Sequence, residues 1–184
     1  MNVRLSILLV AILVLFAGTY GVIRITDQGD RKEKQPWLYK MDDRSIVGIE
    51  VTHSDTTINY YKKPGSTDWY IESADGPIPV PIEKWSGTTL VLSGPQVNRV
   101  LDSGRGTLSE YGLDPPQTIA RITERSGVTR ELHLGYKTPD EANQYAAIAD
   151  DPQLFTVPQV WALVVNNLAI SPPYPDEQDP SENS

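Results

Sequence analysis

The chain has 184 residues, which is enough for one ordinary domain and too few for two comfortable ones. Its 24 acidic and 16 basic residues give a net charge of −8, which argues against a nucleic-acid binder because such proteins need a basic face. The lack of cysteine in the sequence excludes disulfide bonds, thiolate catalysis, cysteine-ligated zinc and a lipoprotein anchor. With two histidines, His53 and His133, there is little material for a histidine metal site.

An uncharged apolar segment near the start of the chain is the strongest single signal. Residues 5–23 contain no charged side chain across 19 positions and are bracketed by Arg4 and Arg24. At a rise of about 1.5 Å per residue, a helix of this length just crosses a hydrocarbon core of about 30 Å. We therefore predict that residues 1–24 are an uncleaved single-pass transmembrane anchor. A cleaved signal peptide is the alternative, although residues 17–19 make a poor cleavage site.

Two features of this anchor allow more than one interpretation. Ala17 and Gly21 have the small-residue spacing that lets two helices approach closely in a membrane, but small residues are also common near the end of any anchor. The basic residues within 24–34 would place the folded domain in the cytoplasm by a simple positive-inside count. The very short N-terminal tail and the lack of cysteine fit export instead.

The segment that follows is polar and then becomes a folded domain. Residues 25–44 have mixed charge and are predicted to be a linker, whose Trp37 and Tyr39 suit a membrane interface or the base of the domain. We expect the domain itself over residues 45–171. Residues 45–53 alternate and predict a half-buried strand. Its expected inner face is Val47, Ile49, Val51 and His53.

Turns and prolines organise the remainder of the domain. Further strands over 56–63 and 68–73 complete a three-stranded meander. Three prolines within residues 77–81 exclude a central strand, and Pro81 can open a short helix that runs through Trp85 and Leu90. Later strands are expected at 96–101, 118–124, 128–135, 143–149 and 153–157, with Ala120, Ile122, Val128, Leu132 and Leu134 facing inward.

The C-terminal part combines a helix and a tail. Residues 158–169 begin with a proline at a permitted first-turn position and present a wide apolar face, which predicts a helix. Residues 172–184 are rich in proline and acid and contain no base, so we expect them to be disordered. The predicted fold class is therefore α+β: mostly antiparallel strand meanders with two short helices, preceded by one transmembrane helix.

Patterns that would indicate chemistry are largely missing from the sequence. Neither GxSxG, a serine-lysine motif, HExxH, an EF-hand loop nor a complete phosphate loop occurs. The acidic pairs 42–43, 140–141 and 150–151 fit solvated turns better than a loose calcium site. His53 is expected to be a packed, hydrogen-bonded residue rather than a ligand, and His133 to be solvated. We predict no catalytic residue, cofactor or metal site.

One group of residues suggests an interaction surface. Two adjacent predicted strands concentrate aromatic rings beside a basic pair, and half of the rings must face away from the core because strand side chains alternate. Outward tyrosine and tryptophan beside lysine can form a protein-binding patch, whereas cross-strand aromatic pairing can also simply stabilise a sheet. The candidate residues are Tyr60, Tyr61, Trp69, Tyr70, Lys62 and Lys63.

An ordered series of motifs in the second half of the chain resembles a known family. The motifs are YGLDPP at 111–116, ELHLGYKTPD at 131–140, QYAAI at 144–148, LFTV at 154–157 and SPPYP at 171–175. Together with the upstream motifs WYI at 69–71, PVPIEKW at 79–85 and LVLSGPQVNRVL at 90–101, they resemble, over roughly residues 45 to 175, the bacterial domain of unknown function DUF4340. The resemblance implies an α+β domain behind an N-terminal anchor in the cell envelope. Some relatives resemble auxiliary parts of gliding-motility ABC transport systems, and longer relatives carry more than one copy.

The YGLDPP motif itself has a structural interpretation. Gly112 can take a positive φ after Tyr111, and Asp114 can accept backbone hydrogen bonds at the turn. Pro116 favours an extended Pro115 ahead of the next strand. Leu113 and Tyr111 are expected to plug the core. The family has no established catalytic residues, so the resemblance transfers none.

These observations lead to one expected function and one alternative. We expect a non-catalytic envelope protein in the bacterial cell membrane, with an extracytoplasmic domain that acts as an accessory or scaffolding subunit of a larger membrane protein complex. Its partners would be the bilayer, through residues 5–23, and other membrane proteins, but no nucleic acid. The alternative is an extracytoplasmic binding module for a small envelope ligand such as a glycan, with Trp69, Tyr70 and Tyr61 as stacking platforms. A glycoside hydrolase is a third class, but its two acids would have to converge to about 5–10 Å.

Overall fold

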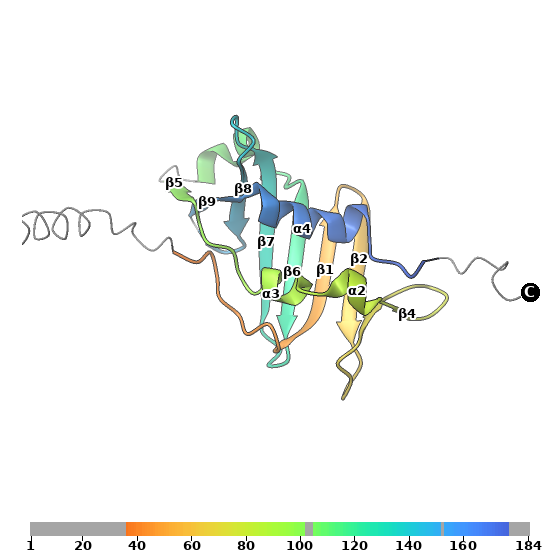
Figure 1. Ribbon diagram of the computed structural model, residues 1–184. Coiled ribbons are helices and arrows are strands. Elements are labelled where there is room, and N and C mark those ends of the chain that lie inside the picture. Colours follow the sequence, from red (N-terminus) through yellow and green to blue (C-terminus); the bar gives the residue numbers. More distant parts are fainter. Residues whose placement is uncertain (1–35, 102–104, 152, 177–184) are drawn as a thin grey trace, which may run out of the picture. The chain divides into compact units, whose positions relative to one another are not determined.

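A computed structural model describes residues 36–101, 105–151 and 153–176 of the chain (Figure 1). The predicted anchor, including Ala17 and Gly21, lies outside these residues, as does the linker before residue 36. Within the described ranges no helix combines the length and the apolar character needed to cross a membrane. The folded unit begins at Pro36, earlier than the expected boundary at residue 45.

The described residues form one nine-stranded antiparallel sheet (Figure 1). Its strands lie in the order β4-β3-β2-β1-β6-β7-β8-β9-β5. Two meanders, β1 to β4 and β6 to β9, thus meet where β1 pairs with β6, and β5 adds to β9 at the edge. The strands are β1 (Ile46–His53), β2 (Thr56–Lys62), β3 (Trp69–Ile71), β4 (Ile78–Pro79), β5 (Arg99–Leu101), β6 (Thr118–Glu124), β7 (Thr129–Lys137), β8 (Asn143–Ile148) and β9 (Leu154–Pro158).

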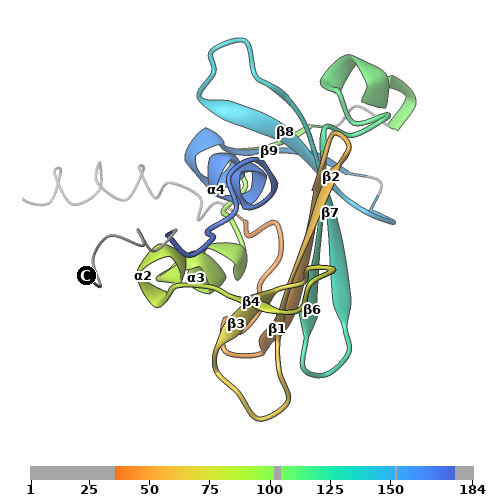
Figure 2. The same cartoon turned by 90° about the vertical axis from the view of Figure 1, so that its right-hand side faces the viewer.

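Helices cover one face of this sheet (Figure 2). They are α2 (Ile82–Trp85), α3 (Thr88–Leu92) and α4 (Gln159–Ile170), and a 3₁₀ helix, η1 (Arg105–Tyr111), precedes β6. The α+β class with a mainly antiparallel sheet is confirmed. The helix expected from Pro81 through Leu90 is broken in two, because Gly87 between α2 and α3 has a left-handed φ of 81°.

The hydrophobic core lies between the helices and the covered face of the sheet. Alternating residues of the central strands point into it, as the pattern predicts. Helix α4 meets them with Trp161, Val165 and Leu168, all buried. The fully buried strand residues include Ile49, Val51, Ala120, Ile122, Leu132, Leu134 and Val157.

Two residues predicted to face inward do not. A register shift in β1 between Ile46 and Gly48 buries Ile46 in place of Val47, because a β-bulge there shifts the alternation of side chains by one position. Val128 is exposed because it belongs to the turn before β7, which begins at Thr129. Both errors arise at strand ends, where alternation alone does not set the register.

The described part of the expected linker is built into the domain. Tyr39 is buried and its hydroxyl donates a 2.7 Å hydrogen bond to the carbonyl oxygen of Leu92, at the end of α3. Burial raises the pKa of the Tyr39 phenol well above its usual range. Leu38 and Met41 are buried beside it, whereas Trp37 is half exposed. Tyr39 therefore packs into the domain at the end of α3.

Candidate functional site

Strands β2 and β3 divide the six residues of the expected aromatic patch between the two faces of the sheet. Tyr60 and Trp69 point into the core and are 1% and 6% exposed. Tyr61 and Tyr70 are register partners on the opposite, helix-free face, where both are partly buried. The six residues therefore do not form one surface, as the alternation of strand side chains requires.

The inward rings pack around Trp85 of α2. The ring centroid of Trp85 lies 5.0 Å from that of Tyr60 and 5.1 Å from that of Trp69. The Tyr60 hydroxyl donates a 2.6 Å hydrogen bond to the carbonyl oxygen of Leu168 in α4. Burial raises the pKa of Tyr60 far above its ordinary value. These rings fasten α2 and α4 to the sheet and leave Trp69 only 6% exposed, which is too little for a sugar to stack on.

The outward pair is smaller than the expected patch. The rings of Tyr61 and Tyr70 have centroids 6.0 Å apart and are tilted by 33°. The ammonium group of Lys63 lies 4.1 Å from the centroid of Tyr70, a cation–π arrangement. On the other face, Lys62 lies 4.8 Å from the Trp69 ring centroid. Tyr61, Tyr70 and Lys63 are thus the part of the expected patch that faces outward.

A charged ladder crosses the same helix-free face. Arg121 of β6 bonds to Glu50 of β1 and to Glu131 of β7, the latter at 2.6 Å, and Glu131 also lies 2.7 Å from Nε2 of His133. The hydrogen bonds from His133 and Arg121 lower the pKa of Glu131. His133 is therefore paired rather than simply solvated. In the sequence, the spacing of Glu131 and His133, two residues apart on one predicted strand, could have indicated this pairing.

A chain of polar side chains runs through the opposite side of the sheet, under α4. His53 Nδ1 lies 2.7 Å from Oγ1 of Thr118, which donates a 2.8 Å hydrogen bond to Asn166 of α4. Asn166 contacts Gln144 at 3.4 Å, and Gln144 donates at 2.7 Å to the carbonyl oxygen of Gly135. Because the Thr118 proton goes to Asn166, His53 must donate through Nδ1. His53 is thus hydrogen-bonded within the fold, as expected.

The YGLDPP motif packs η1 against strands β7 and β8. Gly112 has a φ of 68°, as predicted, and a Cβ there would lie 2.7 Å from the Tyr136 ring. A Cβ at Gly135 would overlap the carbonyl oxygen of Tyr111. Leu113 is buried in a small cluster that also contains Ala147 and Leu154, with Tyr111 packed against it. The Asp114–Pro115 peptide bond is cis.

The outer side of the helix layer carries exposed apolar residues, which the sequence analysis did not predict. Helices α3 and α4 carry no charged side chain. On α4, Val160, Leu163 and Ile170 point away from the core and are exposed, although the rest of the helix packs on the sheet. Trp161 Nε1 ties α4 to the carbonyl oxygen of Val91 in α3 at 2.8 Å. We call the outward residues the helix-layer surface: Ile82, Leu90, Val160, Leu163 and Ile170.

The sequence held a signal for this surface. The outer side of a surface helix normally carries charged and polar residues, whereas residues 159–170 contain no charge at any position. The predicted wide apolar face is correct on the inner side, where Trp161, Val165 and Leu168 are buried. What periodicity could not show is that the remaining side of α4 stays exposed in the described structure.

The acidic pairs lie in turns. Asp42 accepts a hydrogen bond from the backbone of Arg44, Asp151 accepts one from Gln153, and Asp140 accepts from Thr138 and Ala142. These bonds lower the pKa of Asp140. Within the described ranges, no three His, Asp or Glu side chains gather closely enough to hold a metal ion. The observed role of these carboxylates is to accept hydrogen bonds within their own turns.

Comparison with known proteins agrees with the resemblance seen in the motifs. Residues 90–168 match the sequence model of the family described as "Domain of unknown function (DUF4340)". The match runs from α3 into α4 and includes η1, β6 to β9 and the YGLDPP motif. It does not extend to β1 to β4, where the aromatic rings lie. No curated protein and no solved structure matches the chain.

Proposed function

We propose that this chain, which belongs to the DUF4340 family over residues 90–168, is a non-catalytic accessory or scaffolding subunit of a larger membrane protein complex in the bacterial cell envelope. In this proposal residues 5–23 anchor the chain in the membrane as a single pass. The folded domain is extracytoplasmic and docks on another subunit. The observation that carries the proposal is the helix-layer surface.

The helix-layer surface has the properties of an interface. Ile82 and Val160 are 82% and 76% exposed, although both are large apolar residues. Burying such a side chain against a partner contributes about 1.5–3 kcal/mol. Exposed apolar groups that gather on one face mark interaction sites more often than isolated ones do. Val160, Leu163 and Ile170 lie on the same exposed side of α4 and therefore favour association.

The chemistry of the surface also specifies the kind of partner. Because α3 and α4 present no charge, the partner needs an apolar, uncharged surface, such as the apolar side of a helix in another subunit. A charged partner would have to be desolvated without compensation. The charged side chains of the helix layer are Glu83 and Lys84 of α2, next to Ile82. They would form the polar rim.

Site-specific photo-cross-linking in cells tests this docking. A photoreactive phenylalanine analogue at Leu163 should give a discrete adduct with another membrane protein. The matched control places the same analogue at Val128, an exposed apolar residue in the β6–β7 turn, where no discrete adduct is expected. Adducts at Val128 and none at Leu163 would show that docking does not use the helix layer.

The alternative, an extracytoplasmic binding module for a small envelope ligand such as a glycan, draws on the helix-free face. Tyr61 and Tyr70 are partly exposed there beside Lys63, and aromatic faces of this kind can stack on sugars. A thermal-shift screen of cell-wall fragments tests it. A stabilising glycan whose effect is lost in Tyr61→Ala would support the alternative, and a flat response would reject it.

A further inference from the structure

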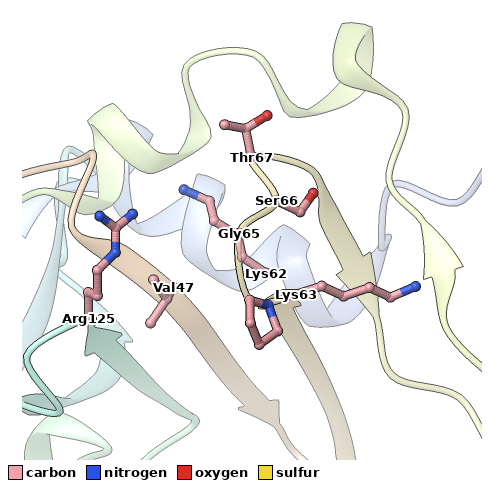
Figure 3. A pocket seen from close by; sticks show the side chains of 8 residues that line it. Val47, Lys62, Lys63, Gly65, Ser66, Thr67 and Arg125 are labelled. Carbon is pink, nitrogen blue, oxygen red and sulfur yellow. The ribbon is translucent and has the colours of Figure 1, made fainter.

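A basic hollow lies at one end of the sheet, beside the β2–β3 loop (Figure 3). It has a volume of about 560 Å³ and is formed by the β2–β3 loop together with the ends of β1 and β6. The bulge in β1 moves Val47 out of the core, so that its side chain lies on the sheet between Lys62 and Arg125. The lining residues are Val47, Lys62, Lys63, Pro64, Gly65, Ser66, Thr67 and Arg125.

The lining contains cations and no acid, although the whole chain carries a net charge of −8. Figure 3 shows the ammonium group of Lys62 and the guanidinium group of Arg125 pointing toward one another across the hollow, whereas Lys63 extends to the other side. The ion pairs formed between described residues involve Lys84, Arg121 and His133, and neither Lys62 nor Arg125.

Two like charges are thus held together with little compensation. Burial and the charge of Arg125 lower the pKa of Lys62, and nearby Asp43 offsets only part of this effect. An anion placed between the two cations would remove their repulsion. A carboxylate supplies one negative charge, whereas a phosphate monoester supplies about 1.5–2 and has oxygens that fit the guanidinium fork. The charge count therefore favours a phosphate monoester.

We propose that this hollow binds a phosphate monoester between Lys62 and Arg125. A second hollow, of about 390 Å³, shares Lys62 and Thr67 with the first and has apolar walls that include Trp69, Pro79 and Ile82, together with the charged side chains of Asp43, Arg44 and Asp68. It lies where the remainder of the ligand would extend. The phosphate group can be carried by a soluble ester or by a lipid of the phosphatidic acid type, and the two sources differ in what they place against these apolar walls.

Thermal shift and calorimetry on the full chain in a neutral detergent test the proposal. The probes are inorganic phosphate, glycerol 3-phosphate and dihexanoyl phosphatidic acid at constant ionic strength, with acetate and dihexanoyl phosphatidylcholine as controls. The three phosphate probes should bind, and the controls should bind at least tenfold more weakly. Tighter binding of the phosphatidic acid than of glycerol 3-phosphate identifies a lipid headgroup, and equal binding identifies a soluble ester.

Variants show whether the two cations are responsible. Lys62→Gln and Arg125→Gln should each weaken binding of the phosphate probes at least tenfold. Lys63→Gln removes the same charge from a side chain that points elsewhere, and should change binding less than threefold. If Arg125→Gln alters the melting temperature without ligand, phosphate binding is compared in Lys62→Gln and Lys62→Met instead. Lack of phosphate binding by the unaltered chain, or equal losses in Lys63→Gln and Lys62→Gln, would overturn the proposal.

Discussion

The hydroxyl of Tyr60 donates a 2.6 Å hydrogen bond to the carbonyl oxygen of Leu168, 108 positions later in the chain. Leu168 lies in the last turn of α4, where carbonyl groups lack partners within the helix. A side chain of β2 thus supplies the hydrogen-bond donor that this carbonyl group lacks within the C-terminal helix. The same ring packs on Trp85, so that α2, α4 and the first meander are held at one point.

Tyr60→Phe should lower the free energy of unfolding by about 1–3 kcal/mol, because it leaves a buried carbonyl oxygen without its donor while preserving the ring. Urea unfolding followed by circular dichroism measures the change. Tyr61→Phe is the matched control, since Tyr61 is on the helix-free face, and its effect should be below about 0.5 kcal/mol. Equal effects of the two substitutions would contradict the anchoring role of Tyr60.

Gly135→Ala should lower the free energy of unfolding by at least about 2 kcal/mol, since the added methyl group would overlap the backbone of Tyr111 and force the YGLDPP segment away from β7. Gly48→Ala is the control, because it makes the same replacement at another glycine within a strand. The nearest atom to its added Cβ would be 3.5 Å away, an ordinary contact. Its unfolding free energy should therefore change by less than about 1 kcal/mol. A tolerated Gly135→Ala would show that η1 does not pack as described.

Asn166→Leu should lower the free energy of unfolding by about 1–3 kcal/mol, because it removes the acceptor of Thr118 and a partner of Gln144 at a buried position. The neighbouring Asn167→Leu changes an exposed side chain of the same helix and is expected to be nearly neutral. Chemical denaturation of both variants measures the difference. A neutral Asn166→Leu would mean that the polar chain under α4 contributes nothing to stability.

The free energy of unfolding should fall in acid partly because Glu131 becomes protonated. Its pKa is lower in the folded state than its ordinary value of 4.5. The resulting stabilisation is present above that ordinary value, and it is lost as the pH falls through the folded pKa. Between about pH 6 and pH 3 the unaltered chain should therefore lose more stability than Glu131→Gln. The difference should be below about 1 kcal/mol because the pair is partly exposed. If the stability of the two proteins changed equally with pH, the charged ladder through Glu131 would not contribute to stability.

The sequence predicts the parts of the fold that depend on local pattern. Alternation identifies Ile49 and Val51 as core residues, and apolar spacing identifies the buried side of α4, because both are set by the geometry of one element. The bulge that buries Ile46 instead of Val47 depends on how β1 pairs with β6. Local pattern does not contain that register.

The candidate surfaces likewise combine features that local pattern predicts with features that depend on contacts between distant segments. Alternation predicts that the aromatic rings of β2 and β3 must separate, but the partner of Tyr60 is 108 residues away and no local spacing points to Leu168. The hollow between Lys62 and Arg125 similarly joins the β2–β3 loop to the end of β6. The exposed side of α4 carries no charge in the sequence itself. Its meaning becomes clear only when the sheet is seen to cover the other side.

Mild-detergent extraction of the full chain from native membranes, followed by native sizing and mass spectrometry, tests the docking proposal most directly. The unaltered chain should co-elute with a stoichiometric set of other membrane proteins. Val160→Glu/Leu163→Glu should lose them while keeping its melting temperature, and Val128→Glu should retain them. A lone species of about 20.4 kDa plus detergent from the unaltered chain would contradict an accessory or scaffolding role.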